Sequence, residues 1–184
     1  MNLIIIGTGY VGLVSGACFA ETGNQVNCID IDKSKIDKLN AGIIPIYEPG
    51  LEELIKNNVI ADRLKFSTHI PTKIPLNSIL IIAVGTPPDK NGEADLSYVY
   101  NAAREIGDRL NNYALIVNKS TIPVGTGEKV EELIHKQLQE RNIDCNFDVV
   151  SNPEFLKEGD AIKDFFYPDR VIIGTDSTKA RDIM

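Results

Sequence analysis

Three glycines near the start of the chain have the spacing of a phosphate-binding turn. Gly7, Gly9 and Gly12 follow an apolar run of strand length and open a helix of small residues, predicted over 11–21. The first glycine permits a tight turn, the second lets a pyrophosphate approach the backbone, and the third lets the helix pack close to the sheet. The free N–H groups at the start of such a helix attract phosphate. The spacing predicts a dinucleotide site, the alternative being a turn that only connects a strand to a helix.

A carboxylate lies about 20 residues beyond these glycines, where a dinucleotide fold binds the adenosine ribose. Asp30 ends the apolar run of the second predicted strand, 25–32, and is the candidate for the carboxylate that binds the ribose. Its charge would repel the 2′-phosphate of NADP, so the sequence predicts NAD as the cofactor. A carboxylate here can also be a helix N-cap, and Asp32, just before the helix predicted over 34–41, is expected to be one.

Strands and helices alternate along the chain, which predicts an α/β fold: a Rossmann-like, doubly wound, mainly parallel sheet with helices on both faces. Residues 1–184 suit one such domain, since 43% of them are hydrophobic. The remaining strands are expected at 63–67, 77–84, 113–118, 147–151 and 170–174. The remaining helices are expected at 51–57, 96–110 and 128–140, with the tail 175–184 beginning another.

The loops that follow the strands are the informative ones, because ligands of a doubly wound sheet bind outside the carboxyl ends of its strands. Each loop could also be a simple turn. The loop after 147–151 is harder to explain in that way, because it places Glu154, Lys157 and Glu158 beside Phe155. The five loops expected to share one edge of the sheet are 7–12, 30–35, 85–88, 119–126 and 152–159.

The composition narrows the possible partners. A formal net charge of −7 argues against nucleic acid or an anionic membrane, because both need clustered Lys and Arg. No apolar run reaches transmembrane length, and no signal peptide is recognised. Cys18, Cys28 and Cys145 form no disulfide or metal pattern, so no metal site is predicted. The first two cysteines are expected to be buried, and a reducing cytoplasm is the expected compartment.

Several further segments are more specific than the glycine turn. In chain order they are Gly-Thr-Gly-Tyr-Val-Gly at 7–12, Glu-Pro-Gly-Leu at 48–51, Val-Gly-Thr-Pro at 84–87, Lys-Ser-Thr-Ile-Pro-Val-Gly-Thr at 119–126, Ser-Asn-Pro-Glu-Phe-Leu-Lys-Glu-Gly at 151–159 and Tyr-Pro-Asp-Arg at 167–170. Together they resemble the UDP-glucose/GDP-mannose dehydrogenase family over nearly the whole chain. The Pro-Val-Gly-Thr and Tyr-Pro-Asp-Arg segments are more similar to its UDP-glucose branch.

The resemblance implies an NAD-dependent oxidoreductase that oxidises C6 of UDP-glucose twice, which gives UDP-glucuronate and two NADH. In the family, a cysteine thiol captures the aldehyde and the resulting thioester is hydrolysed. The cofactor-binding residues it implies are Gly7, Gly9, Tyr10, Val11, Gly12, Asp30, Lys35, Thr86, Thr121 and Glu158. Those at the sugar nucleotide are Glu154, Phe155, Leu156, Lys157 and Glu158, and the catalytic ones are Thr121, Glu154 and Glu158.

Two of these roles are chemically specific. The resemblance places Thr121 near the nicotinamide, where it would help to order a water, and makes Glu154 a general base around thioester hydrolysis. The chemistry agrees, because a hydroxyl that loses hydride also loses a proton and therefore needs a positioned base or water. The alternative for Glu154 is a glutamate in the first turn of a helix after Pro153, stabilised by the helix dipole.

Part of the family's machinery has no match in the chain. The family carries its nucleophilic cysteine in a Cys-x-Pro-Lys-Asp segment of a second domain, which a long central helix joins to the first. No such segment occurs here, and none of the three cysteines has the expected neighbours. We therefore expect the cofactor-binding half of an enzyme, inactive alone, whose full-length form is a homodimer or larger homo-oligomer.

Three alternatives stay open. The first is a dehydrogenase of another nucleotide sugar, such as UDP-N-acetylhexosamine or GDP-mannose. The second is another two-domain NAD enzyme, acting on a hydroxyacid or 6-phosphogluconate, although the Asn-Pro-Glu-Phe-Leu run argues against it. The third is a stand-alone NAD-binding module without catalysis, which would not need the constellation of Thr121 with Glu154 and Glu158.

Overall fold

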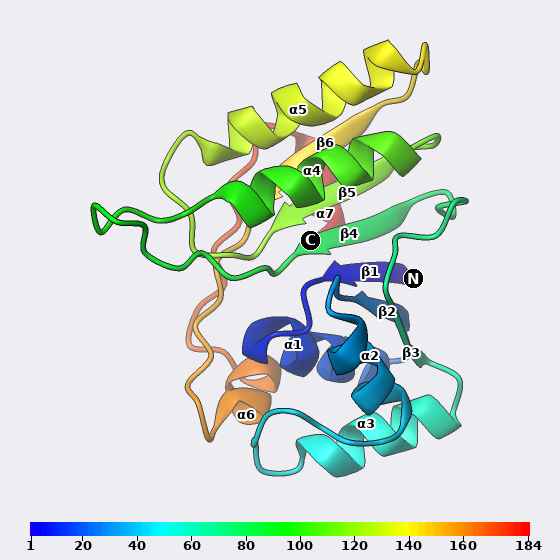
Figure 1. The fold of residues 1–184 in the computed structure, drawn as a ribbon, viewed down its shortest axis with the longest axis vertical. Coiled ribbons are helices and arrows are strands. Elements are labelled where there is room, and N and C mark those ends of the chain that lie inside the picture. Colours follow the sequence, from blue (N-terminus) through cyan, green and yellow to red (C-terminus); the bar gives the residue numbers. More distant parts are fainter.

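The computed structural model describes all residues, 1–184, and is built on one six-stranded sheet with every pairing parallel (Figure 1). The strand order is β3-β2-β1-β4-β5-β6, which confirms the predicted Rossmann-like, doubly wound class. The strands are β1 (Asn2–Ile6), β2 (Gln25–Ile29), β3 (Leu64–Ser67), β4 (Ser78–Ile82), β5 (Ala114–Asn118) and β6 (Phe147–Ser151).

The strand order changes direction at the centre of the sheet. The chain runs outward from β1 to β2 and β3, and then crosses to β4, which pairs with the other side of β1. Leu3, for example, is paired with Val26 of β2 and with Ile79 of β4. Open α/β sheets bind ligands in the crevice at such a switch point, outside the carboxyl ends of the strands.

Helices cover both faces of the sheet (Figure 1). One apolar cluster packs α1, α2, α3, α6 and α7 on one face, and a second packs α4 and α5 on the other. All residues of β4 and β5 are buried, as expected for parallel strands between two layers. No helix combines the length and the apolar character needed to cross a membrane. The helices are α1 (Tyr10–Glu21), α2 (Lys33–Asn40), α3 (Leu51–Ile60), α4 (Ser97–Arg109), α5 (Thr126–Glu140), α6 (Ala161–Phe166) and α7 (Thr178–Ile183).

Small residues let α1 lie directly on the sheet. A Cβ added to Gly16 would be 2.4 Å from the sulfur of Cys28 on β2, so only glycine fits this close approach. Cys28 and Cys18 are fully buried, as predicted, and both face the same apolar cluster. Burial raises the pKa of both thiols to about 12, so neither is a reactive thiolate.

The structure corrects the predicted elements in two places. The strand expected at 170–174 does not form, because only Gly174 pairs with the sheet, through an antiparallel bridge to Ser151 of β6. Val171 and Ile172 are exposed, and residues 170–173 make no backbone hydrogen bond to the sheet, although Ile173 packs against the first apolar cluster. Helix α6 was not predicted from the sequence, whereas the helix beginning in the tail is confirmed as α7.

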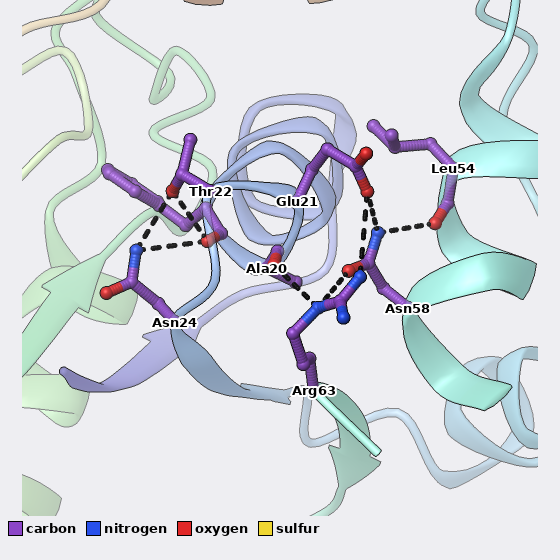
Figure 2. Close-up of polar contacts among 8 residues, drawn as sticks. Ala20, Glu21, Thr22, Asn24, Leu54, Asn58 and Arg63 are labelled. Carbon is purple, nitrogen blue, oxygen red and sulfur yellow. Dashed lines mark hydrogen bonds and ion pairs between the residues drawn. The ribbon is translucent and has the colours of Figure 1, made fainter. Parts of the chain in front are cut away.

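A polar cluster fixes the far end of α1 to α3 and to the start of β3 (Figure 2). The side chain of Asn58 is fully buried, donates to Glu21 Oε2 and to the carbonyl of Leu54, both at 2.8 Å, and accepts from Arg63 Nε at 2.9 Å. Arg63 Nε also donates to the carbonyl of Ala20, one of the last carbonyls of α1, at 3.1 Å. Both N–H donors and the oxygen of the Asn58 amide are thus hydrogen-bonded, and the amide holds the C-terminal end of α1.

Replacing Asn58 with alanine should lower the free energy of unfolding by about 1–3 kcal/mol, because it leaves Glu21 and Arg63 without their shared partner. The neighbouring Asn57 is exposed on the same helix and serves as a matched control, and Asn57→Ala should cost less than about 0.5 kcal/mol. Urea unfolding of the two variants and the parent checks both values. Equal losses in the two variants would contradict the role given to Asn58.

Candidate dinucleotide-binding site

The turn after β1 leaves no room for a side chain at two of its glycines. Gly7 has a φ of +102°, and a Cβ there would lie 2.5 Å from the carbonyl oxygen of Ala83. A Cβ on Gly12 would lie 1.9 Å from the carbonyl oxygen of Gly7. A Cβ on Gly9 would meet nothing within 4 Å, so the space beside its backbone is open. The geometry matches the turn, the close packing and the open approach for which these glycines were singled out.

The start of α1 faces this open space with free donors. Gly9 is the N-cap of the helix, and no side chain caps that end. The first N–H groups, including those of Tyr10 and Val11, have no partner within the helix and carry the positive end of its dipole. An anion placed over Gly9 would meet several backbone donors and no obstructing side chain.

Asp30 lies at the end of β2 beside the turn, with a side chain that is only 11% exposed. Its Oδ2 accepts from the backbone N–H of Thr8 at 2.9 Å and from the Thr8 hydroxyl at 2.8 Å. The ammonium of Lys35 donates to the same oxygen at 2.8 Å, which brings these two predicted residues together. Asp32 is the N-cap of α2, as predicted, and its Oδ1 accepts from the N–H of Lys35.

The bonds to Asp30 keep it charged while leaving it able to accept another bond. Burial acts to raise its pKa, but the hydrogen bonds from Lys35, Asp32 and Thr8 outweigh burial and hold the pKa below its usual value. Oδ2 accepts three of these bonds, and Oδ1 accepts one, from the N–H of Asp32 at 3.0 Å. A carboxylate oxygen accepts at least two hydrogen bonds, so Oδ1, which accepts one, can still accept a hydroxyl.

A cavity of about 450 Å³ lies over the switch point between β1 and β4. Its volume is in the range of small-ligand sites. The glycine turn forms one wall, the end of β2 another, and α4 a third. The residues that line it include Gly7, Gly9, Asp30, Ile31, Lys35, Val84, Gly85, Tyr98, Asn101 and Glu105. The cavity therefore connects the open side of the turn to the carboxylate of Asp30.

The loops after β4 and β5 meet at the same edge of the sheet. The hydroxyl of Thr86 donates to the carbonyl oxygen of Thr121 at 3.0 Å. The side chain of Thr121 itself is exposed at this edge and free to contact a bound molecule. The structure thus places two predicted cofactor-binding residues next to each other.

The loop after β6 borders a second cavity, of about 540 Å³. Glu154, Phe155, Leu156 and Lys157 line it, whereas Glu158 is exposed and does not. Within the loop, Glu154 Oε2 accepts from the backbone N–H of Leu156 at 2.6 Å. Glu154 does not lie in the first turn of a helix, since α6 begins only at Ala161, which removes the structural alternative considered for it.

Three residues at these sites were not singled out from the sequence. Thr8 is buried and fixes Asp30, although its place between two glycines gives a signal only once Asp30 is known. Lys119 is 8% exposed and donates to Asn152 Oδ1 at 2.9 Å; burial lowers its pKa, and the nearby charge of Glu154 acts in the opposite direction. Glu48 is 5% exposed and accepts from the hydroxyl of Tyr10, although the sequence marked it only as part of a segment.

None of the cysteines lies at these cavities. Cys18 and Cys28 are inside the core, and Cys145 lies just before β6, at the edge of the sheet opposite the glycine turn. No group of three or more His, Cys, Asp or Glu side chains that could hold a metal ion occurs in the chain. The chain itself therefore supplies backbone donors, carboxylates and hydroxyls, and no accessible thiol at this edge.

The strand order, the glycine turn and the carboxylate at the end of β2 define a dinucleotide-binding Rossmann domain. Comparison with known proteins then gives the family. The sequence model for the NAD binding domain of the UDP-glucose/GDP-mannose dehydrogenase family matches residues 1–184. The chain belongs to this family, and the cofactor predicted from Asp30, NAD, agrees with it.

Relatives and solved structures agree with this assignment. The chain is 56% identical over 183 residues to the UDP-glucose 6-dehydrogenase TuaD of Bacillus subtilis, and the match covers 100% of the chain and 39% of that protein. A UDP-glucose dehydrogenase from Pyrobaculum islandicum is 39% identical with a TM-score of 0.86, covering 99% of the chain and 42% of that structure. A GDP-mannose dehydrogenase from Pseudomonas aeruginosa is 35% identical with a TM-score of 0.90, covering 100% of the chain and 43% of that structure. The chain thus spans about two fifths of the length of these relatives.

Replacing Asp30 with asparagine should lower the free energy of unfolding at neutral pH by about 1–3 kcal/mol, since its charge-assisted bonds are lost. The folded pKa of Asp30 lies below the unfolded value, so its contribution is present above about pH 4 and is lost as the pH falls through the folded pKa. The difference between parent and variant should therefore shrink below about pH 4, as measured by urea unfolding across pH.

Asp37→Asn is the control, because it removes an exposed ion pair with Lys33 on α2. Such a pair should contribute less than about 1 kcal/mol at any pH. A difference between Asp30→Asn and the parent that does not change with pH would contradict the account of Asp30.

Proposed function

We propose that this chain is the NAD-binding part of a dehydrogenase that oxidises UDP-glucose at C6 to UDP-glucuronate in two steps. The observation that carries the proposal is the arrangement at one sheet edge. The open glycine turn and Asp30 lie at the carboxyl ends of β1 and β2, and the Glu154–Lys157 loop lies at the end of β6. The relative from Bacillus subtilis bears the name of this activity, which supports the choice of substrate.

The residues that line the first cavity suit a dinucleotide. The N–H groups of Tyr10, Val11 and Gly12 would hold the pyrophosphate, because Gly9 leaves its approach open. Asp30 Oδ1 would accept from a ribose hydroxyl at the adenosine end, beside Lys35. Gly7 shapes the turn, and Thr86 and Thr121 would contact the nicotinamide half. When bound, NAD would supply the acceptor for hydride.

The residues of the second cavity fit the remaining chemistry. Each oxidation of the sugar carbon removes a hydride and a proton, and the proton needs a base or an ordered water. Glu154, held by the N–H of Leu156, is the carboxylate that we assign to activating water during thioester hydrolysis. Thr121 would order a water near the nicotinamide, and Glu158 would contact both the cofactor and the reacting centre.

The sugar nucleotide would lie along the loop after β6. Glu154, Phe155, Leu156, Lys157 and Glu158 would border it. The thiol that forms the thioester would come from outside these 184 residues, because no cysteine lies at this edge. The complete enzyme would be a cytoplasmic homodimer or larger homo-oligomer. A different nucleotide sugar is the second candidate, favoured by the 0.90 TM-score to a GDP-mannose dehydrogenase.

Replacing Gly9 with valine should weaken NAD binding at least about 100-fold, because the side chain fills the open approach to the turn. The melting temperature should fall by no more than about 4 °C, because a Cβ at this position meets no atom within 4 Å and only the poorer N-cap of α1 costs stability. Isothermal titration with NAD and a thermal scan measure the two effects. Gly174→Ala is the control, since its Cβ would make only an ordinary 3.5 Å contact with Ser151, and its NAD affinity should equal that of the parent.

The 184-residue chain should bind NAD but should not sustain its reduction when UDP-glucose is added. The thiol that would capture the aldehyde and allow the second oxidation is missing at this edge, because two cysteines are buried and the third lies at the opposite edge. Absorbance of NADH in a mixture of chain, NAD and UDP-glucose checks this expectation. Sustained production of NADH would contradict the assignment of the thiol to a part of the enzyme outside this chain.

A further inference from the structure

One buried carboxylate connects the start of α1 with the loop that follows β6. Glu48 lies in the segment between α2 and α3, directly before Pro49, and is 5% exposed. It forms no ion pair with any lysine, arginine or histidine of the chain. A buried charge without a counter-ion is costly unless hydrogen bonds stabilise it, so its partners indicate why it is there.

The partners of Glu48 come from two different loops. The hydroxyl of Tyr10, the first residue of α1, donates to Glu48 Oε2. The backbone N–H of Gly159 donates to the same oxygen at 2.8 Å, and that of Ala161 donates to Oε1 at 2.9 Å. The N–H of Gly159 also lies 3.2 Å from the Tyr10 hydroxyl. One carboxylate therefore joins the start of α1 to the loop that follows β6.

The protonation states of Glu48 and Tyr10 suit the hydrogen bond between them. Burial acts to raise the pKa of Glu48, but the bonds from Tyr10, Gly159 and Ala161 outweigh it and hold the pKa below its usual value. Burial, together with the bond to Glu48, raises the pKa of Tyr10 to about 12. At neutral pH the Tyr10 phenol therefore donates a hydrogen bond that the Glu48 carboxylate accepts, and the link between α1 and the loop after β6 is intact. The charge of Glu158 contributes to the same rise in the pKa of Tyr10.

From this geometry we infer that Glu48 is a positioning residue that transmits occupancy of the glycine turn to the Glu154–Ala161 loop. An anion at the N-terminus of α1 binds to the N–H groups around Tyr10 and restrains that residue. Because Tyr10 and Gly159 share one carboxylate, restraining Tyr10 makes it harder for the loop to open. By thermodynamic linkage, an opened loop weakens binding at the turn to the same extent. This inference rests on the proposed function, since it assumes that NAD binds at the turn.

Amide hydrogen exchange of the 184-residue chain, read residue by residue by NMR with and without saturating NAD, tests the connection. In the parent, NAD should slow exchange of the Gly159 and Ala161 amides by about tenfold or more, because both are bonded to Glu48. In Glu48→Gln one acceptor becomes a donor, so NAD should still bind but should change these exchange rates less than about twofold.

Two further variants complete the test. Tyr10→Phe keeps the bonds from Gly159 and Ala161 to Glu48 and removes only the hydroxyl, so it should abolish the NAD-dependent slowing even if Glu48→Gln fails to fold. Tyr113→Phe is the matched control, because Tyr113 donates to Asp148 at 2.6 Å at the opposite edge of the sheet. Its response to NAD should equal that of the parent.

The outcomes separate this inference from the proposed function. If titration shows that the parent does not bind NAD, the proposed function fails and the inference fails with it. If the parent binds NAD but exchange at Gly159 and Ala161 does not slow, the inference alone is overturned. Full slowing in both Glu48→Gln and Tyr10→Phe would overturn it as well, since the loop would then respond by another route.

Discussion

The close contact between the start of α1 and the ends of β1 and β4 is the constraint on which the rest of the structure depends. A Cβ on Gly12 would come within 1.9 Å of the Gly7 carbonyl oxygen, and one on Gly7 within 2.5 Å of the Ala83 carbonyl oxygen. Any side chain at either position would push the helix away from the sheet. The contact brings the free N–H groups of α1 to the switch point of the sheet, where the cavity lies.

Two carboxylates are positioned by residues at this contact, and hydrogen bonds fix both of them. Asp30 accepts from the backbone and the hydroxyl of Thr8, so the turn itself holds this carboxylate at the end of β2. Glu48 accepts from Tyr10 and from the backbone of Gly159, so the first residue of α1 also fixes the loop after β6. The glycine turn and the first residue of α1 therefore fix both Asp30 and the loop after β6, and α1 is held at its other end by Asn58 and Arg63 (Figure 2).

The sequence predicts the fold well because the features that determine it are local. Buried parallel strands are short apolar runs, and the glycine spacing reports the backbone conformation of a single turn. The role of Glu48 could not be predicted in this way, because its partners lie 38 residues before it and 111 residues after it. Helix α6 has six residues, too few for a periodic pattern. The segment 170–174 has strand-like residues but pairs with the sheet only at Gly174, which only the assembled sheet reveals.

The central claim is that a dinucleotide lies across the switch point of the sheet. A crystal structure of the chain with NAD bound would test this claim most directly. The account predicts the pyrophosphate over Gly9, within hydrogen-bonding distance of the first N–H groups of α1. It also predicts a hydroxyl of the adenosine ribose on Asp30 Oδ1, and the nicotinamide on the side of Thr121. Density for NAD elsewhere, or with the adenosine beside Thr121 and the nicotinamide beside Asp30, would contradict the account.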